Sequence, residues 1–118
     1  MNEIHIGRFE YCLNVADINA SFEFYQKLGF SAVTDMRDEG YVIMSNGDAR
    51  IALFQGHIER NLLNFRGADV FAIAKELQSR GLVLSKEAHI EHDGSAAAEI
   101  IDPDGNVIYF NTFPGEKK

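Results

Sequence analysis

The sequence is poor in cysteine and in basic residues, and it has no long hydrophobic run. Cys12 is the one cysteine among 118 residues, so no internal disulfide can form, which fits a reducing compartment. Eleven Lys and Arg against eighteen Asp and Glu give a net charge of −7, which argues against a nucleic-acid or anionic-membrane partner. The sequence also lacks a membrane-spanning stretch and the pattern of a secretory signal. We therefore expect a cytoplasmic protein without nucleic-acid or membrane partners.

The overall composition and length are those of one globular domain. Hydrophobic residues make up 46% of the chain and charged residues 25%, which is ordinary for a folded protein. The length allows a single hydrophobic core of useful size, so we expect one domain over residues 1–118. Because the net charge is negative, an anionic ligand would need arginines placed locally at its site.

Two stretches of the chain are alike. The segment "VADINASFEFYQKLGFSAV" begins at Val15, and "GADVFAIAKELQSRGLVLS" begins at Gly67. Asp17 then matches Asp69 and Gly29 matches Gly81; both pairs are 52 positions apart (17 to 69 and 29 to 81), so no gap is needed. Matching landmarks in one register indicate an internal duplication.

Each copy is predicted to be a helix within a larger repeated unit. The aspartate is a suitable N-cap, apolar residues recur at helical spacing, and the glycine ends the helix. Short alternating runs flank each helix and predict strands at 9–15, 31–36, 41–45 and 50–55 in the first copy, and at 62–66, 83–88, 96–101 and 106–112 in the second. The unit is strand, helix, strand, strand, strand. It occurs twice, in module 1 (about 8–56) and module 2 (about 60–113) of an α+β protein.

The repeated unit and the ending "IIDPDGNVIYF" resemble the vicinal oxygen chelate superfamily, which includes glyoxalase I, bleomycin-resistance proteins and extradiol dioxygenases. In that turn, Gly105 supplies the left-handed backbone between two strands. The resemblance implies two βαβββ modules forming an eight-stranded half-open barrel with the helices outside. It also implies a binding site on the concave face, and a homodimer as a common state. It does not specify an activity, because the fold carries many.

Metal-using members of that family draw their ligands from the first and last strands of each module. Carried onto this sequence, the four positions hold Glu10, Ala52, Leu62 and Tyr109. Ala52 and Leu62 have no donor atom, so the usual metal site is expected to be absent and no cofactor is expected. The alternative is a divalent metal ion held by Glu10 with relocated donors such as His57 or His89. The stretch "HIEHDG" containing His89 is more typical of a solvated loop.

Strand alternation predicts which side chains face the cleft. In the first strand, Phe9, Tyr11, Leu13 and Val15 should pack against the helix, which turns the residues between them toward the concave face. The same alternation through the other inner strands gives a mixed apolar and polar lining typical of a small-molecule site. Arg50 and Arg66 could hold a carboxylate or phosphate, although either could instead pair with an acidic side chain. The predicted binding residues are Glu10, Cys12, Asn14, Arg50, Phe54, Asn64, Arg66, Tyr109 and Asn111.

Three functions are compatible with these residues. The first is a metal-independent protein that sequesters a small anionic or planar compound, similar to bleomycin-resistance members. The second is a metal-dependent lyase or isomerase resembling glyoxalase I, with relocated ligands. The third is a metal-free enzyme with Tyr109 or Glu10 as acid or base. The loss of ligands at Ala52 and Leu62 favours the first, and whether the protein is an enzyme stays open.

Overall fold

A computed structural model describes residues 3–113. The chain forms two compact units, one of Glu10–Leu62 and one that joins the residues up to Phe9 with those from Leu63 onward. Within the described range, no helix is long and apolar enough to cross a membrane. Each unit is described below by itself.

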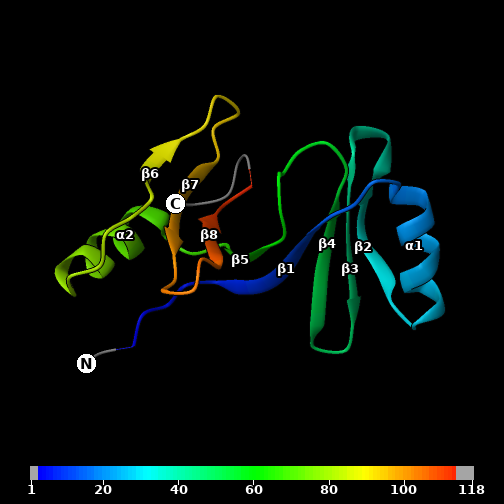
Figure 1. The fold of residues 1–118 in the computed structure, drawn as a ribbon, viewed down its shortest axis with the longest axis horizontal. Coiled ribbons are helices and arrows are strands. Elements are labelled where there is room, and N and C mark those ends of the chain that lie inside the picture. Colours follow the sequence, from blue (N-terminus) through cyan, green and yellow to red (C-terminus); the bar gives the residue numbers. More distant parts are fainter. Residues whose placement is uncertain (1–2, 114–118) are drawn as a thin grey trace. The chain divides into compact units, whose positions relative to one another are not determined.

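The first unit contains a four-stranded sheet and one α-helix (Figure 1). Its strands stand in the order β2-β3-β4-β1. β1 runs parallel to β4, and the other neighbours are antiparallel. In Figure 1, α1 lies along the β2–β4 part of this sheet. The elements are β1 (Arg8–Asn14), whose first two residues are counted with the second unit, α1 (Ile18–Lys27), β2 (Ser31–Met36), the short 3-10 helix η1 (Arg37–Glu39), β3 (Tyr41–Asn46) and β4 (Ala49–Phe54).

The second unit repeats this arrangement. Its strands stand in the order β5-β8-β7-β6, with β5 parallel to β8 and the other neighbours antiparallel. Since the element order and the strand pairing match those of the first unit, the predicted α+β fold of two βαβββ modules is confirmed. The elements are β5 (Leu62–Arg66), α2 (Val70–Ser79), β6 (Lys86–Ile90), β7 (Ala96–Ile101) and β8 (Val107–Asn111).

Both helices begin and end as the repeat predicts. Asp17 and Asp69 are the N-caps, and the Oδ1 atom of each accepts a hydrogen bond of 3.1 Å from a backbone amide in the first turn. Gly29 follows α1 with φ of +100°, a left-handed conformation that ends the helix at low cost because glycine has no Cβ.

Each unit has its own hydrophobic core between the helix and one face of the sheet. In the first unit, Leu13 and Val15 of the predicted helix-facing set pack against this core. In the second unit, the N-terminal residues Ile4 and Ile6 pack against the core. The buried core residues are Ile18, Phe22, Val42, Met44, Ile51 and Leu53 in the first unit, and Ala68, Val70, Ile73, Ala74, Leu77, Leu84, Ala96, Ala98, Ile100 and Phe110 in the second.

The alternation predicts that Phe9 and Tyr11 are covered by the helix, but both side chains are largely exposed. They are 43% and 38% exposed. The helix is shorter than the strand. The ten residues of α1 span about 15 Å, whereas the seven residues of β1 span about 23 Å. Only the end of the strand next to α1 is therefore covered.

The sixth strand is displaced from its predicted range of 83–88. It runs from Lys86 to Ile90, because pairing with β7 starts where Lys86 stands opposite Glu99. Val83 is 86% exposed, and Leu84 reaches the core from outside any strand. His89 consequently lies in a strand, so the prediction of a solvated loop was wrong at that residue.

Candidate functional site

The predicted binding residues of the first unit lie on the face of the sheet opposite the helix. β1 and β4 pair in parallel, with Leu13 opposite Leu53 in the helix-side core. Successive side chains of a strand point to opposite faces. The residue pairs on the other face are therefore Cys12 with Ala52 and Asn14 with Phe54.

Glu10 and Arg50 directly precede the paired residues Tyr11 and Ile51 on β1 and β4, and they form a buried ion pair. Arg50 Nε donates to Glu10 Oε2 over 2.7 Å, and the side chains of Arg50 and Glu10 are only 11% and 3% exposed, respectively. A charge buried this deeply is tolerated only when an opposite charge and hydrogen bonds compensate for lost hydration. The pairing thus explains how both charged side chains can be buried. Glu10 holds Arg50 in place, and Arg50 neutralises the carboxylate that the family would use as a metal ligand.

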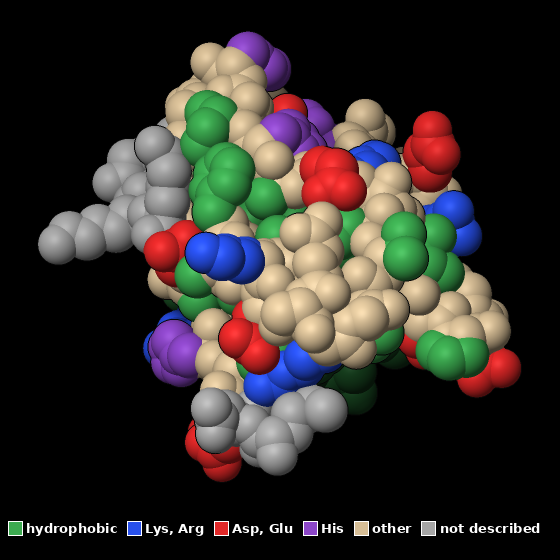
Figure 2. All heavy atoms as spheres, turned by 90° about the vertical axis from the view of Figure 1, so that its left-hand side faces the viewer, with side chains coloured by type: hydrophobic (Ala, Val, Ile, Leu, Met, Phe, Trp, Pro, Cys, Tyr) green, Lys and Arg blue, Asp and Glu red, His purple; other side chains and the backbone are tan. Residues whose placement is uncertain are grey.

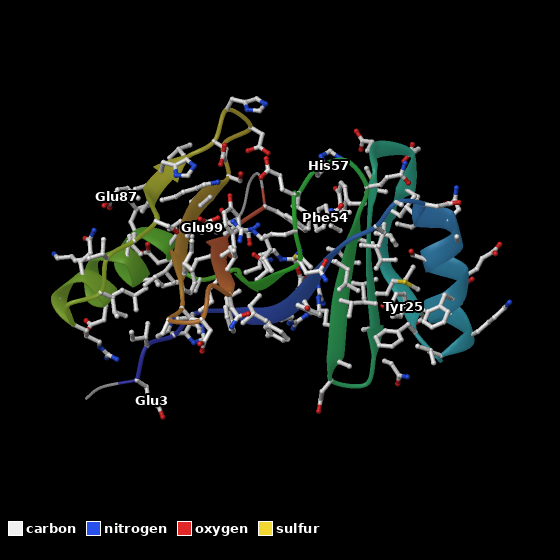
Figure 3. All side chains as sticks on the ribbon, viewed as in Figure 1. Glu3, Tyr25, Phe54, His57, Glu87 and Glu99 are labelled. Atoms are coloured by element: carbon white, nitrogen blue, oxygen red, sulfur yellow. The ribbon has the colours of Figure 1, made fainter. Side chains whose placement is uncertain are left out.

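The other end of this face is aromatic. Phe54 stacks on Tyr41, with ring centroids 5.9 Å apart and an angle of 21° between the rings. The rings of His57 and Phe54 are arranged edge to face with centroids 6.2 Å apart, and Figure 3 shows the two labelled side chains close together. The His57 Nε2 atom lies 2.8 Å from the Glu39 carbonyl oxygen. Asn14 has a structural role, because its Nδ2 donates to the Glu59 carbonyl over 3.4 Å and its backbone N–H donates to Asn61 Oδ1 over 2.8 Å.

Four predicted residues of the second unit share the face opposite α2. β5 and β8 pair in parallel, so Asn64 stands opposite Tyr109 and Arg66 opposite Asn111. Asn64 is 4% exposed. The Arg66 guanidinium lies 3.8 Å from the ring centroid of Phe113, a cation–π contact. Within residues 3–113, the buried Oδ1 atom of Asn111 has no hydrogen-bond partner.

Tyr109 is a neutral hydrogen-bonding group at physiological pH. Burial raises the pKa of its phenol to about 12, and the negative charges of Glu91, Glu99 and Asp93 contribute to the shift. Glu99 stands directly opposite Tyr109 on the neighbouring strand, and its Oε1 accepts a 2.8 Å hydrogen bond from the Ser85 hydroxyl. A phenol held neutral in this way is a donor and a poor general base.

The Tyr109 shift predicts a spectroscopic result. In an alkaline titration followed at the tyrosinate absorbance, Tyr109→Phe should remove the component with a midpoint near pH 12. Because the folded-state pKa is raised, the associated stability is present below pH 10 and is lost as the pH rises through 12. After allowance for partial solvent screening, it amounts to about 1 kcal/mol. Loss of a component titrating near pH 10 instead would contradict this.

His89 is engaged at both ring nitrogens. Nδ1 lies 2.8 Å from the Glu87 carbonyl oxygen, and Nε2 lies 2.8 Å from Glu91 Oε1. The pKa of His89 is raised, mainly by the hydrogen bond to the Glu87 carbonyl and further by the Glu91 carboxylate. Both contacts favour a protonated ring, which cannot bind a metal ion.

The residues at the family's metal-ligand positions do not fit a divalent ion. Ala52 and Leu62 offer no donor, Glu10 is paired with Arg50, and Tyr109 is a neutral phenol. No group of three or more His, Cys, Asp or Glu among the described residues is arranged to hold a metal ion. A divalent ion needs about three or four protein donors to displace its hydration. We therefore assign no chemical step to a metal.

Each unit has a shallow hollow on its surface among the described residues. The hollow of the first unit has a volume of about 490 Å³ and lies beside the Asp35–Arg37 ion pair. The hollow of the second unit has a volume of about 450 Å³ and is lined by Arg66 together with His5, Gly7, Arg8 and Gly67. Sequence reasoning identified Arg66 but missed His5 and Arg8, because the N-terminal segment lies outside the repeated unit. The available signal was the alternation of Ile4, His5 and Ile6.

A family model described as "Bleomycin resistance protein-like N-terminal" matches residues 10–47. Among curated proteins, no sequence matches this chain. A glyoxalase/bleomycin resistance protein/dioxygenase superfamily member from Vibrio splendidus 12B01 is similar in structure, with a TM-score of 0.64 and 18% identity over 89% of this chain and 97% of that one.

Two further solved structures are similar. One is described as the NAD-dependent benzaldehyde dehydrogenase from Legionella pneumophila, with a TM-score of 0.75 and 15% identity over 88% of this chain and 97% of that one. The other is the Mn(II)-bound glyoxalase from Novosphingobium aromaticivorans, with a TM-score of 0.56 and 15% identity over 91% of this chain and 38% of that one. At these identities the likeness concerns the fold. Together with the family model, it confirms the predicted resemblance.

Proposed function

We propose that this chain, which has the vicinal oxygen chelate fold, is a metal-independent protein that binds and sequesters a small anionic or planar compound. The observation that carries the proposal is the buried Glu10–Arg50 ion pair. It places a guanidinium on the face where metal-using members of the family assemble their ligands. Although Glu10 balances the charge of this guanidinium, its remaining N–H groups can donate hydrogen bonds to an anionic group there without a metal ion. From the resemblance, we also propose a cytoplasmic homodimer.

Arg50 is suited to this role because only part of its guanidinium is used. Its Nε atom donates to Glu10. The two terminal nitrogens have no hydrogen-bond acceptor in the part of the chain that the structure describes. A guanidinium can present these two nitrogens as a fork to a carboxylate or a phosphate. Glu10 restricts the side chain to one geometry, which lowers the entropy lost when a ligand binds.

The aromatic end of the same face can accept a planar group. Phe54 and Arg50 are four residues apart on β4 and therefore lie on the same face, about 13 Å apart along the strand. Phe54 is already stacked with Tyr41, so the rings form an ordered surface. A small aromatic acid would place its charge at Arg50 and its ring toward Phe54.

The two enzymatic alternatives gain no support from the geometry. A metal-dependent lyase or isomerase needs relocated donors, but His57 contacts the Glu39 carbonyl and His89 is engaged at both nitrogens. A metal-free acid or base at Tyr109 would have to work with a pKa of about 12, far from neutral pH.

The proposal is tested by calorimetric titration with three matched probes: benzoate, which is planar and anionic, benzamide, which is planar and neutral, and cyclohexanecarboxylate, which is anionic and not planar. Benzoate should bind more tightly than either of the other two, and equally well with and without EDTA. Arg50→Ala should weaken benzoate binding about tenfold or more, because charge-assisted hydrogen bonds are lost. Arg60→Ala, which removes an exposed arginine of the same unit, is the control.

Two results would contradict the proposal. One is binding that disappears in EDTA and returns with a divalent cation, because Arg50 would then not suffice. The other is an equal loss of benzoate binding in Arg50→Ala and Arg60→Ala, which would reflect net charge alone.

A further inference from the structure

The outer face of α1 carries two exposed hydrophobic side chains one turn apart. Phe24 is 59% exposed and Leu28, the C-cap, is 56% exposed. Residues four apart lie on the same side of a helix, so the two side chains form one apolar stripe. Ala20, one turn earlier on the same side, is small and also exposed. The core of the first unit is served by Ile18 and Phe22 instead, so the apolar stripe is not part of that core.

The internal duplication shows that the apolar stripe is not required by the repeated fold. At the offset of 52 positions, Phe24 corresponds to Glu76 of α2 (24 to 76) and Leu28 to Arg80 (28 to 80). Glu76 and Arg80 form an ion pair along α2, with an N–O distance of 3.0 Å. Figure 2 views the molecule from the side on which α2 lies in Figure 1, and acidic, basic and hydrophobic side chains are interspersed there. The same helix positions are thus charged in one module and apolar in the other, which is typical of a contact surface on α1.

Two charged residues beside the apolar stripe favour a second copy of this chain as the partner. Glu23 and Lys27 are exposed and lie one turn apart along the same side of the stripe. Within residues 3–113 neither of them forms an ion pair, although the charge of Glu23 acts on Arg37. Two α1 helices that pack antiparallel would bring this side of one copy against the same side of the other. The order of the two charges is then reversed between the copies, so each acid can meet a base.

One register satisfies the charges and the apolar stripe together. In an antiparallel pair of helices centred at the level of Tyr25, Glu23 of each copy lies at the level of Lys27 of the other, because both are two residues from the centre. With a rise of about 1.5 Å per residue, Phe24 then lies between Phe24 and Leu28 of the second copy. An apolar seam bordered by pairs of opposite charge is the usual arrangement of paired helices.

We propose that α1 is the surface through which two copies of this chain pair, with their helices antiparallel. This proposal rests on the homodimer proposed above and names its contact surface. It does not involve Arg50 or the ligand proposed for it. An interface with one helix from each copy is small, so we expect a dissociation constant in the micromolar range.

The first test replaces the apolar stripe by its counterpart from α2. Phe24→Glu/Leu28→Arg gives α1 the pair of charges that α2 carries, so the helix should stay folded, which circular dichroism verifies. In sedimentation equilibrium of the full chain, this variant should weaken the dimer about a hundredfold or more, because the apolar side chains are no longer buried between the copies. Val83→Thr, which changes another exposed hydrophobic residue, should leave the dimer unchanged.

The second test exchanges the charges beside the apolar stripe, at low ionic strength so that salt does not screen them. Lys27→Glu places carboxylates opposite one another in both pairs and should weaken the dimer about fivefold or more. Glu23→Lys/Lys27→Glu should restore it, because antiparallel packing again sets opposite charges at one level. Recovery of this kind requires that the partner carry the same substitutions, which identifies it as a second copy.

Three results would overturn parts of this account, and they are distinguishable. A parent chain that stays monomeric up to about 500 μM would overturn both the homodimer and the α1 surface. A dimer unaffected by Phe24→Glu/Leu28→Arg would overturn the α1 surface and leave the homodimer. A dimer that Glu23→Lys/Lys27→Glu fails to restore would overturn the antiparallel pairing. None of these variants alters Arg50, so the benzoate titration succeeds or fails separately.

Discussion

Glu10→Ala is expected to lower the free energy of unfolding by about 3–5 kcal/mol. The physical reason is that the variant leaves the Arg50 guanidinium, only 11% exposed, without its carboxylate partner. The protein must then bury an uncompensated charge or open the structure to hydrate it. Denaturant unfolding followed by circular dichroism measures the loss. Glu10→Gln, which keeps the volume and removes the charge, should show most of the same effect.

The matched control is the ion pair between Asp35 and Arg37 in the same unit. Its N–O distance of 2.9 Å is similar, but both side chains are about one third exposed. Exposed pairs contribute about 0–1 kcal/mol, so Asp35→Asn should change the stability by no more than that. The double variant Glu10→Leu/Arg50→Leu should recover much of the loss, because it removes both charges. Equal losses in Glu10→Gln and Asp35→Asn would contradict the buried pair.

Gly7→Ala is expected to lower the free energy of unfolding by about 3 kcal/mol. The left-handed conformation at φ of +96° costs an L-residue about 1–2 kcal/mol. The added Cβ would also collide with the backbone carbonyl of Arg66, and displacing a packed backbone costs a similar further amount. Thermal and denaturant unfolding both report this loss.

Gly94→Ala separates the two contributions. Gly94 has nearly the same φ, +91°, but apart from its chain neighbours no atom of the described residues lies within 4 Å of the position that a Cβ would take. It belongs to the same unit, so its replacement should cost only the conformational part, about 1–2 kcal/mol. Equal losses at the two glycines would show that the N-terminal segment does not lie against β5 as described.

The elements that the sequence predicts well are those with local causes. The caps Asp17 and Asp69 and the terminal Gly29 act within one helical turn, so their roles are visible in a few residues. The same holds for the turn before β8, where Asp102 accepts hydrogen bonds from the backbone and side chain of Asn106. The duplication then gave the order of the remaining strands.

The errors arise where packing beyond the local sequence decides. The apolar residues that follow α2 predicted a strand. However, Leu84 packs in the core, and pairing with β7 begins only at Lys86. Phe9 and Tyr11 follow the alternation of the strand, yet both are largely exposed, and α1 is shorter than β1. Neither the helix length relative to the strand nor the start of a ladder is encoded in the hydrophobic pattern.

For the candidate site, alternation identified the face but not the pairing. The sequence placed Glu10 and Arg50 on one face and allowed Arg50 an acidic partner, but it could not name that partner. The pairing depends on the register between two parallel strands that are joined by a long connection, and that register appears only in the structure. The hollow of His5 and Arg8 was missed for a related reason, since it forms where a segment outside the repeat meets the end of β5.

The most direct test of metal independence is a calorimetric titration of the purified protein with Zn²⁺, Ni²⁺, Mn²⁺ and Fe²⁺, combined with elemental analysis of protein prepared without chelators. With Ala52 and Leu62 at two ligand positions and Glu10 paired with Arg50, we predict no stoichiometric metal and no saturable uptake. One equivalent of a divalent cation, bound with micromolar affinity and lost in Glu10→Gln or Tyr109→Phe, would contradict the account.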